Sequence, residues 1–270
     1  MFIRKDQTYI ISDDALSKIL KDPANPLGQI AKILPDTAKV LDIGAGNGML
    51  GRVLRHAGKQ VIIDGIEPSE FAAKLAAPFY RNVYKGYAQD HAQTMRAEQY
   101  DYIVLADVIE HTPDPAAFLT DIIGNLPDTT KVIISIPNVA FGGVRLALLN
   151  GTFDYVDSGL LERTHLRFFT LSTALRLFEQ LQVYPERILS LERSFFRMEF
   201  SRKVLSAMPF TIINLARKSD ARAYQYLFVL AHKPCVPDTE HYGASALTIL
   251  VDIIFARPAI KRMAHRWRKN

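Results

Sequence analysis

The chain has very little cysteine and no long apolar run, and both absences exclude classes of protein. Among its 270 residues only Cys235 is a cysteine, so no intrachain disulfide can form, which suits a reducing compartment. No stretch has the roughly 18 uninterrupted apolar residues of a membrane-spanning helix, because the closest, residues 244–256, contains Asp252. The first residues also lack the apolar segment of a secretory signal. We therefore expect a cytoplasmic protein with an ordinary buried core.

Most of the chain also lacks an excess of positive charge, although the net charge is +5. Residues 1–190 contain 19 Lys and Arg against 22 Asp and Glu, a balance of −3, whereas residues 191–270 contain 14 against 6, a balance of +8. The basic character therefore belongs to the C-terminal third. Because no aromatic stacking module accompanies this charge, no nucleic-acid partner is predicted.

Between residues 39 and 137, short runs rich in Val and Ile alternate with segments of helical period. This alternation predicts an α/β fold, in which a mostly parallel sheet is covered by helices on both faces. Asp114 before Pro115, and Thr170 further on, are typical of helix starts. The strands that we expect span residues 39–43, 60–66, 82–84, 100–106, 131–136, 183–191 and 223–231.

The other segments surround this α/β domain, which we place at residues 38–235. Residues 1–37 are expected to form a helical lid over the site. Residues 193–221 are too long for a simple turn between the last two strands, so they are predicted to be a helical insertion. Residues 236–270 are expected to form a basic extension that contains an amphipathic C-terminal helix.

The sequence VLDIGAGNG, residues 40–48, indicates a buried strand, a glycine-rich turn and the start of a helix. Glycine lets the backbone adopt positive φ and lets a ligand approach closely. Taken alone, the pattern also satisfies a dinucleotide fingerprint. Asp42 separates the two interpretations, because its carboxylate would repel a pyrophosphate but attract the ammonium of a phosphate-free sulfonium donor. The pattern therefore favours S-adenosyl-L-methionine over NAD.

Three motifs, in order, resemble those of class I S-adenosylmethionine-dependent methyltransferases. VLDIGAGNG is similar to the first motif, IEPSE at 66–70 to the second, and YDYIVLADVIEHTPDP at 100–115 to the fourth-strand motif. The resemblance implies a Rossmann-like, seven-stranded sheet and methyl transfer from S-adenosyl-L-methionine, with Glu67 on the ribose. Tyr87 departs from the family, which often has an acidic residue near the adenine. The predicted cofactor-binding residues are Asp42, Gly44, Ala45, Gly46, Asn47, Gly48, Glu67, Pro68, Tyr87, Ala106 and Asp107.

Two histidines are candidates for the catalytic base that a hydroxyl acceptor needs near neutral pH. His111 follows the fourth strand, and His165 lies in a polar, aromatic-rich segment at 150–170. The alternatives are that His111 caps or packs against the next helix, and that this segment is a salt-bridged loop. No metal site is predicted. The predicted substrate-binding residues of the segment are Asp154, Asp157, Arg163 and Arg167.

The run GLLERTHLRFFT, residues 159–170, is similar to a subgroup of bacterial methyltransferases often encoded beside surface-polysaccharide and glycan assembly enzymes. The resemblance implies a sugar or glycan hydroxyl as acceptor, although the subgroup commonly has Asp at the place of Glu162. Two alternatives stay open. The D-V-x-E-H pattern also occurs in relatives that methylate quinone-like or other lipophilic phenols. A cofactor-binding, non-catalytic partner is the other, and the intact glycine turn and Glu67 argue against it.

The end of the chain combines basic and apolar residues. Residues 257–270 contain six Lys and Arg, together with Trp267 and no acidic residue, after the apolar run TILVDIIF. An amphipathic helix of this kind can lie on an anionic bilayer, which predicts peripheral attachment at the inner membrane face. The alternative is that the helix packs on the domain or makes a homodimer through its apolar face.

Overall fold

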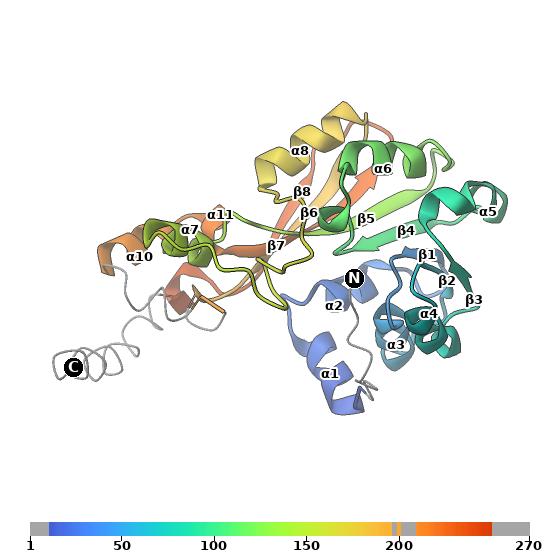
Figure 1. The fold of residues 1–270 in the computed structure, drawn as a ribbon, viewed down its shortest axis with the longest axis horizontal. Helices are drawn as coiled ribbons and strands as arrows, with labels where there is room; N and C mark the ends of the chain where they lie inside the picture. Colours follow the sequence, from blue (N-terminus) through green and yellow to red (C-terminus); the bar gives the residue numbers. More distant parts are fainter. Residues whose placement is uncertain (1–10, 196–198, 201–208, 250–270) are drawn as a thin grey trace.

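A computed structural model describes residues 11–195, 199–200 and 209–249. Its centre is one eight-stranded sheet with the order β3-β2-β1-β4-β5-β7-β6-β8 (Figure 1). Neighbouring strands are parallel, except that β7 runs antiparallel to β5 and β6. The strands are β1 (Lys39–Ile43), β2 (Ile62–Glu67), β3 (Asn82–Lys85), β4 (Tyr102–Ala106), β5 (Lys131–Pro137), β6 (Tyr184–Glu192), β7 (Ala223–Ala231) and β8 (Asp238–Gly243).

The predicted fold class is confirmed, and the strand count differs by one. Every expected strand is present, but β8 was not predicted and lies in the segment assigned to the basic extension. Its sequence, DTEHYG, is polar and its side chains are exposed or half-buried, so no apolar run indicates a strand. Pairing with β6 forms it instead, supported by the ion pair between Arg187 and Glu240 at 2.6 Å.

Helices cover both faces of the sheet (Figure 1). The apolar side chains of α1 to α4 share one core with inward residues of β1, β2, β6 and β7. Those of α5, α6 and α8 share a second core on the other face. The helices of these layers are α1 (Asp13–Lys21), α2 (Pro26–Ile33), α3 (Met49–His56), α4 (Glu70–Ala76), α5 (Ala92–Glu98), α6 (Pro115–Ile123) and α8 (Leu171–Gln180).

Side-chain caps fix where several of these helices begin. The carboxylate of Asp114 accepts a hydrogen bond from the backbone N–H of Ala117 at 3.0 Å, with Pro115 in the first turn of α6. The hydroxyl of Thr170 caps α8 in the same way. Both predicted helix starts are confirmed, because the capping oxygen takes up a backbone donor that the first turn leaves unsatisfied.

A third apolar core lies beyond the carboxyl ends of β5 and β6, next to the amino end of β7. It joins α7 (Gly142–Leu149), α10 (Pro209–Ala216) and α11 (Ser219–Arg222) around Phe141 and Phe195. These three helices lie together, away from the end of the sheet that holds β3 (Figure 1). Both α10 and α11 fall within the predicted insertion at 193–221, of which residues 196–198 and 201–208 are outside the described residues.

The two terminal predictions have different outcomes. Helices α1 and α2 pack on the sheet beside α3, and the prediction that residues 1–37 form a lid stays a prediction. Residues 250–270, with most of the predicted membrane-binding helix, lie outside the described residues. Within the described ranges, no helix has the length and apolar character needed to cross a membrane.

Candidate active site

The turn between β1 and α3 stands at the carboxyl edge of the sheet, where open α/β sheets bind their ligands. Gly44, Gly46 and Gly48 have φ of 79°, 55° and 80°, in the left-handed region that favours glycine. A Cβ on Gly48 would come within 2.7 Å of the Cα of Ala76 in α4. Glycine at this position therefore serves helix packing as well as turn geometry, a reason that the sequence did not reveal.

Asp42 lies buried beneath this turn, with 3% of its surface exposed. Its Oδ2 accepts a hydrogen bond from the hydroxyl of Tyr80 at 2.6 Å, and Tyr80 in turn accepts one from the N–H of Gly51 at 3.3 Å. Burial raises the pKa of Asp42 to about 7, although the Tyr80 hydrogen bond opposes this and the nearby Glu67 adds to it. Among the described residues no basic side chain offsets the charge.

Glu67 lies at the end of β2, at the place predicted for ribose binding. Its two carboxylate oxygens accept hydrogen bonds from the backbone N–H groups of Gly46 at 2.9 Å and Ser69 at 2.8 Å. Glu67 therefore fixes the shape of the glycine turn. Each oxygen keeps a second lone pair, which is the acceptor that a ribose hydroxyl needs.

The other predicted cofactor residues differ in accessibility. Gly44, Pro68 and Asp107 are exposed at the rim, Asn47 and Ala106 are half-buried, and Ala45, Gly46 and Gly48 are buried. Tyr87 is 67% exposed at the end of β3, beyond the glycine turn. Its contact with adenine stays a prediction, as do the other assigned roles.

These residues fit S-adenosylmethionine by charge. A buried carboxyl without a basic partner is costly when ionised, and a bound ammonium group supplies the missing partner. The methionine end of the cofactor carries such an ammonium. Asp42 is therefore the residue that would hold it, while the turn from Gly44 to Gly48 brings backbone rather than side chains close to the ligand.

Asp107 links three strands at the carboxyl edge. Its φ of 55° is unusual for a residue other than glycine. Its Oδ1 accepts hydrogen bonds from the Ser135 hydroxyl of β5 at 2.9 Å and from the Gln225 amide of β7. Sequence reasoning missed Ser135 and Gln225, because both lie inside strands and only the neighbouring positions of β4, β5 and β7 bring them to Asp107.

Glu110, His111 and His165 meet just beyond β4. One possible ligand atom from each lies within 4.8 Å of the others, and the two imidazole rings have centroids 4.8 Å apart at 73°. The segment carrying His165 is held there because the N–H groups of Leu166 and Arg167 donate to the backbone carbonyl of Glu110 at 2.8 and 3.0 Å. The structure thus joins both predicted histidines and adds Glu110, a member of the D-V-x-E-H pattern.

Backbone carbonyls select the tautomer of both neutral imidazoles. His111 Nδ1 lies 3.1 Å from the carbonyl oxygen of Thr164, and His165 Nδ1 lies 3.0 Å from that of Leu160. A carbonyl oxygen only accepts, so each Nδ1 carries the hydrogen and each Nε2 keeps its lone pair. Burial and the neighbouring His165 lower the pKa of His111. Burial, with the charge of Asp107, raises the pKa of Glu110 well above its usual range.

A cavity of about 430 Å³ opens beside His165, lined also by Tyr155, Arg163, Leu166 and Phe168. The predicted substrate-binding residues are only partly gathered here. Arg163 lines the cavity and forms an exposed ion pair with Asp157 at 3.3 Å. The guanidinium of Arg167 instead donates to the carbonyl of Pro113 at 2.8 Å, and Asp154 is exposed outside the lining.

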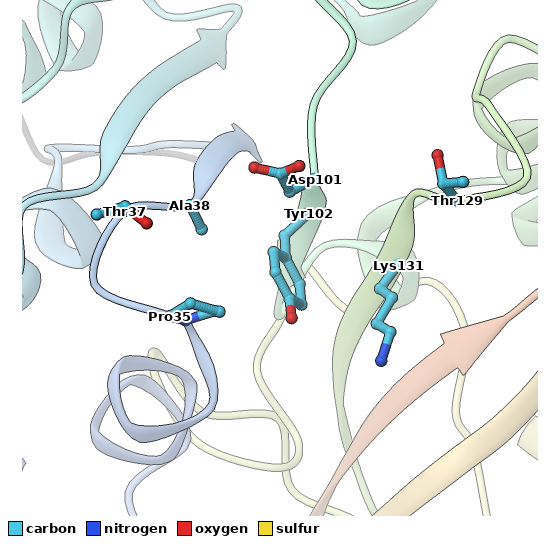
Figure 2. Close-up of a pocket in the computed structure, with 7 residues that line it drawn as sticks. All are labelled: Pro35, Thr37, Ala38, Asp101, Tyr102, Thr129 and Lys131. Carbon is cyan, nitrogen blue, oxygen red and sulfur yellow. The ribbon is translucent and has the colours of Figure 1, made fainter.

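Two further cavities mark opposite edges of the sheet. One of about 540 Å³ adjoins Gln225 at the carboxyl edge, where the α1–α2 connection contributes Pro23 and Pro26. The other, of about 320 Å³, lies at the amino-terminal ends of β1, β4 and β5, where Figure 2 shows Tyr102 and Lys131. Because ligands of open α/β sheets bind at the carboxyl ends, the cavity in Figure 2 is not the active site.

The sheet order, the glycine turn and the carboxyl-edge site define a class I methyltransferase architecture. Residues 15–184 match the profile of a family described as a methyltransferase domain, and this is more than half of the chain. The chain belongs to this methyltransferase-domain family. The domain is that of an enzyme, and its cofactor is S-adenosylmethionine.

Curated relatives match part of the chain. The ubiquinone biosynthesis O-methyltransferase of Hydrogenovibrio crunogenus is 35% identical over 132 residues, which cover 42% of this chain and 54% of that protein. The protein of the same name from Xanthomonas axonopodis pv. citri is 26% identical over 138 residues, covering 50% and 57%. The chain thus spans about half the length of these relatives.

Solved structures support the fold alone. A Thermotoga maritima protein described as a S-adenosylmethionine-dependent methyltransferase superposes with a TM-score of 0.53 at 17% identity, covering 82% of this chain and 94% of that one. A Bacillus halodurans protein described as a putative methyltransferase gives 0.51 at 18% identity, covering 82% and 100%. The predicted α/β architecture is thereby confirmed.

Proposed function

We propose that this protein transfers a methyl group from S-adenosylmethionine to a hydroxyl of a sugar or glycan. The observation that carries the proposal is the meeting of Glu110, His111 and His165 at the carboxyl end of β4. An aliphatic hydroxyl is a very weak acid, so its oxygen attacks well only if a nearby group takes its proton. A buried cluster of three titratable groups is more than a readily ionised acceptor requires.

The reaction needs one bond to form and one to break. The acceptor oxygen bonds to the methyl carbon while the carbon–sulfur bond breaks, and the sulfur keeps the electron pair as the neutral thioether of S-adenosylhomocysteine. The hydroxyl proton passes to Nε2 of His165 or His111, whose lone pairs are free because each Nδ1–H faces a carbonyl. Glu110 lies within 4.8 Å of both histidines, and the imidazolium that forms there favours the ionised state of its carboxyl.

The cavity beside His165 supports a sugar as acceptor. Tyr155 and Phe168 offer aromatic surfaces, and Arg163 supplies several donors for hydroxyl groups. Arg163 and its partner Asp157 are exposed at the rim, so a polar acceptor can reach them without the burial of an unpaired charge. A mixed aromatic and polar lining of this kind suits a carbohydrate ring.

A second candidate is a lipophilic phenol, which the names of the relatives favour, since they are called ubiquinone biosynthesis O-methyltransferases. A phenol ionises near pH 10 and therefore needs less help from a base. The two candidates differ in how strongly catalysis depends on the histidines.

The test is methyl transfer from labelled S-adenosylmethionine to a panel of sugar nucleotides, glycans and catechol-type phenols, followed by mass measurement of the products. With a sugar acceptor, His165→Asn and His111→Asn should each lower kcat by roughly 10²- to 10⁴-fold while cofactor binding is retained. His56→Asn, which removes an imidazole far from the site, is the control. A methylated phenol with little loss in the variants would select the second candidate. Cofactor binding without transfer to any hydroxyl would contradict both.

A further inference from the structure

Glu110 is unusual among the buried acids of the described residues. Only 1% of its surface is exposed, yet neither carboxylate oxygen has a hydrogen-bond partner. Leaving a buried polar group unsatisfied is costly, and more so if the group is charged. Asp42 and Asp64, which are also buried, each accept side-chain hydrogen bonds. An unpartnered buried carboxyl with two imidazoles beside it points to a ligand that would satisfy it.

The hydrogen bonds of both imidazoles suit metal binding. A histidine that binds a metal through one ring nitrogen almost always donates its other N–H to a carbonyl or carboxylate, which fixes the ring and the tautomer. His111 does so to the carbonyl of Thr164, and His165 to that of Leu160. Both Nε2 lone pairs are thus left for a ligand, and two backbone carbonyls, those of Thr164 and Glu110, join the two segments.

We propose that Glu110, His111 and His165 bind one divalent cation of the first transition series, such as Zn²⁺, Mn²⁺ or Co²⁺. Two imidazoles and one carboxylate suit these ions, whereas Mg²⁺ and Ca²⁺ prefer oxygen ligands throughout. Ions of this kind bind at about 2.0–2.2 Å, so their ligand atoms lie at most about 4.4 Å apart. The observed limit of 4.8 Å is about 0.4 Å above this value.

Three protein ligands leave at least one position of the ion for a fourth ligand, such as an oxygen. His165 also lines the 430 Å³ cavity, so an acceptor hydroxyl held in that cavity would lie beside the ion. An ion held by these residues would supply Lewis-acid chemistry, lowering the pKa of the hydroxyl oxygen bound to it so that the proton could leave to solvent. In this respect the inference rests on the proposed function. The same Nε2 lone pairs hold either the proton or the cation, so an experiment can separate the two.

The experiment uses the full chain after chelation and dialysis. Equilibrium dialysis against Zn²⁺ or Mn²⁺, with bound metal measured by mass spectrometry, should give one ion per chain. Glu110→Gln keeps the size of the side chain and should weaken this binding by at least on the order of 100-fold, and His165→Asn should do the same. His56→Asn is the matched control and should bind the ion as the unaltered chain does.

The outcomes separate the two proposals. One ion bound by the unaltered chain and lost in both variants supports the site, whatever acceptor is used. Equal binding in the unaltered chain and in Glu110→Gln, or preference for Mg²⁺ over Zn²⁺ and Mn²⁺, would overturn it. Hydroxyl methylation that continues unchanged in the chelated chain would overturn the role of the cation in activating the acceptor and leave the proposed function intact. If an ion binds at the cluster but no hydroxyl is methylated, the cation site is kept and the proposed function is overturned.

Discussion

Asp42 offers a direct test of how the cofactor site stores unfavourable energy. The pKa of this carboxyl is about 7 in the folded protein, against an ordinary value of 3.8, so ionisation of Asp42 destabilises the folded state. At 1.36 kcal/mol for each pH unit between the two values, the ionised group weakens folding by about 4 kcal/mol at pH 8. We expect Asp42→Asn, which keeps an acceptor for the Tyr80 hydroxyl, to make the cofactor-free protein more stable by up to that amount.

The pH dependence gives the sign of the effect. Because the folded-state pKa of Asp42 is raised, its contribution to stability is fully present below about pH 3.8 and is lost as the pH rises through about 7. The advantage of Asp42→Asn should therefore be small near pH 4, grow to pH 7 and then stay constant. Urea unfolding at several pH values measures it.

Asp64 is the matched control, since it is buried on the neighbouring strand β2. Burial opposes its ionisation, but hydrogen bonds from Arg81 and Tyr100 outweigh this and hold the pKa of Asp64 below its usual value. Asp64→Asn should therefore destabilise the protein, by roughly 1.5–3 kcal/mol. A loss of stability in Asp42→Asn at pH 8, or a difference that does not change with pH, would refute the reasoning.

Asp42→Asn, although expected to be more stable than the unaltered protein, should bind the cofactor less tightly. Asp42→Asn removes the charge that attracts the methionine ammonium, and we expect affinity for S-adenosylmethionine to fall roughly 10- to 100-fold, the equivalent of one charge-assisted hydrogen bond of 1.5–3 kcal/mol. Calorimetric titration at pH 8 measures this. Unchanged affinity would show that Asp42 does not hold the ammonium.

Three further predictions concern the same domain. Gly48→Ala should cost about 1–3 kcal/mol more in unfolding free energy than Gly58→Ala. Both glycines have positive φ, but an added Cβ would meet the α4 backbone at Gly48 and nothing within 4 Å at Gly58. Equal losses in urea unfolding would contradict this. Phe178→Ala should cost about 3–5 kcal/mol, since this ring is fully buried between α8 and the sheet, and a loss under 1 kcal/mol would argue against that packing. Tyr80→Phe removes the hydrogen bond that lowers the pKa of Asp42, so cofactor affinity, titrated across pH, should reach its plateau at a higher pH than in the unaltered protein.

Local composition was enough to predict most strands of the sheet and the class of cofactor. Buried parallel strands are continuous runs of Val and Ile, so β1, β4 and β5 can be predicted within two residues from local composition. The glycine turn and Asp42 are contiguous, and their chemistry can be inferred without knowledge of distant residues. The edge strand β8 could not be found in this way, because its polar residues gain their strand conformation from pairing with β6.

The tertiary structure alone decided which distant side chains complete the site. Asp42 shares a hydrogen bond with Tyr80, Asp107 with Gln225, and His111 lies against His165, pairs that no local pattern relates. The backbone hydrogen bonds from Leu166 and Arg167 to Glu110 form only once the segment after α7 folds back over the end of β4. Local periodicity reports which face of an element is buried, whereas the partner on that face depends on how the whole chain closes.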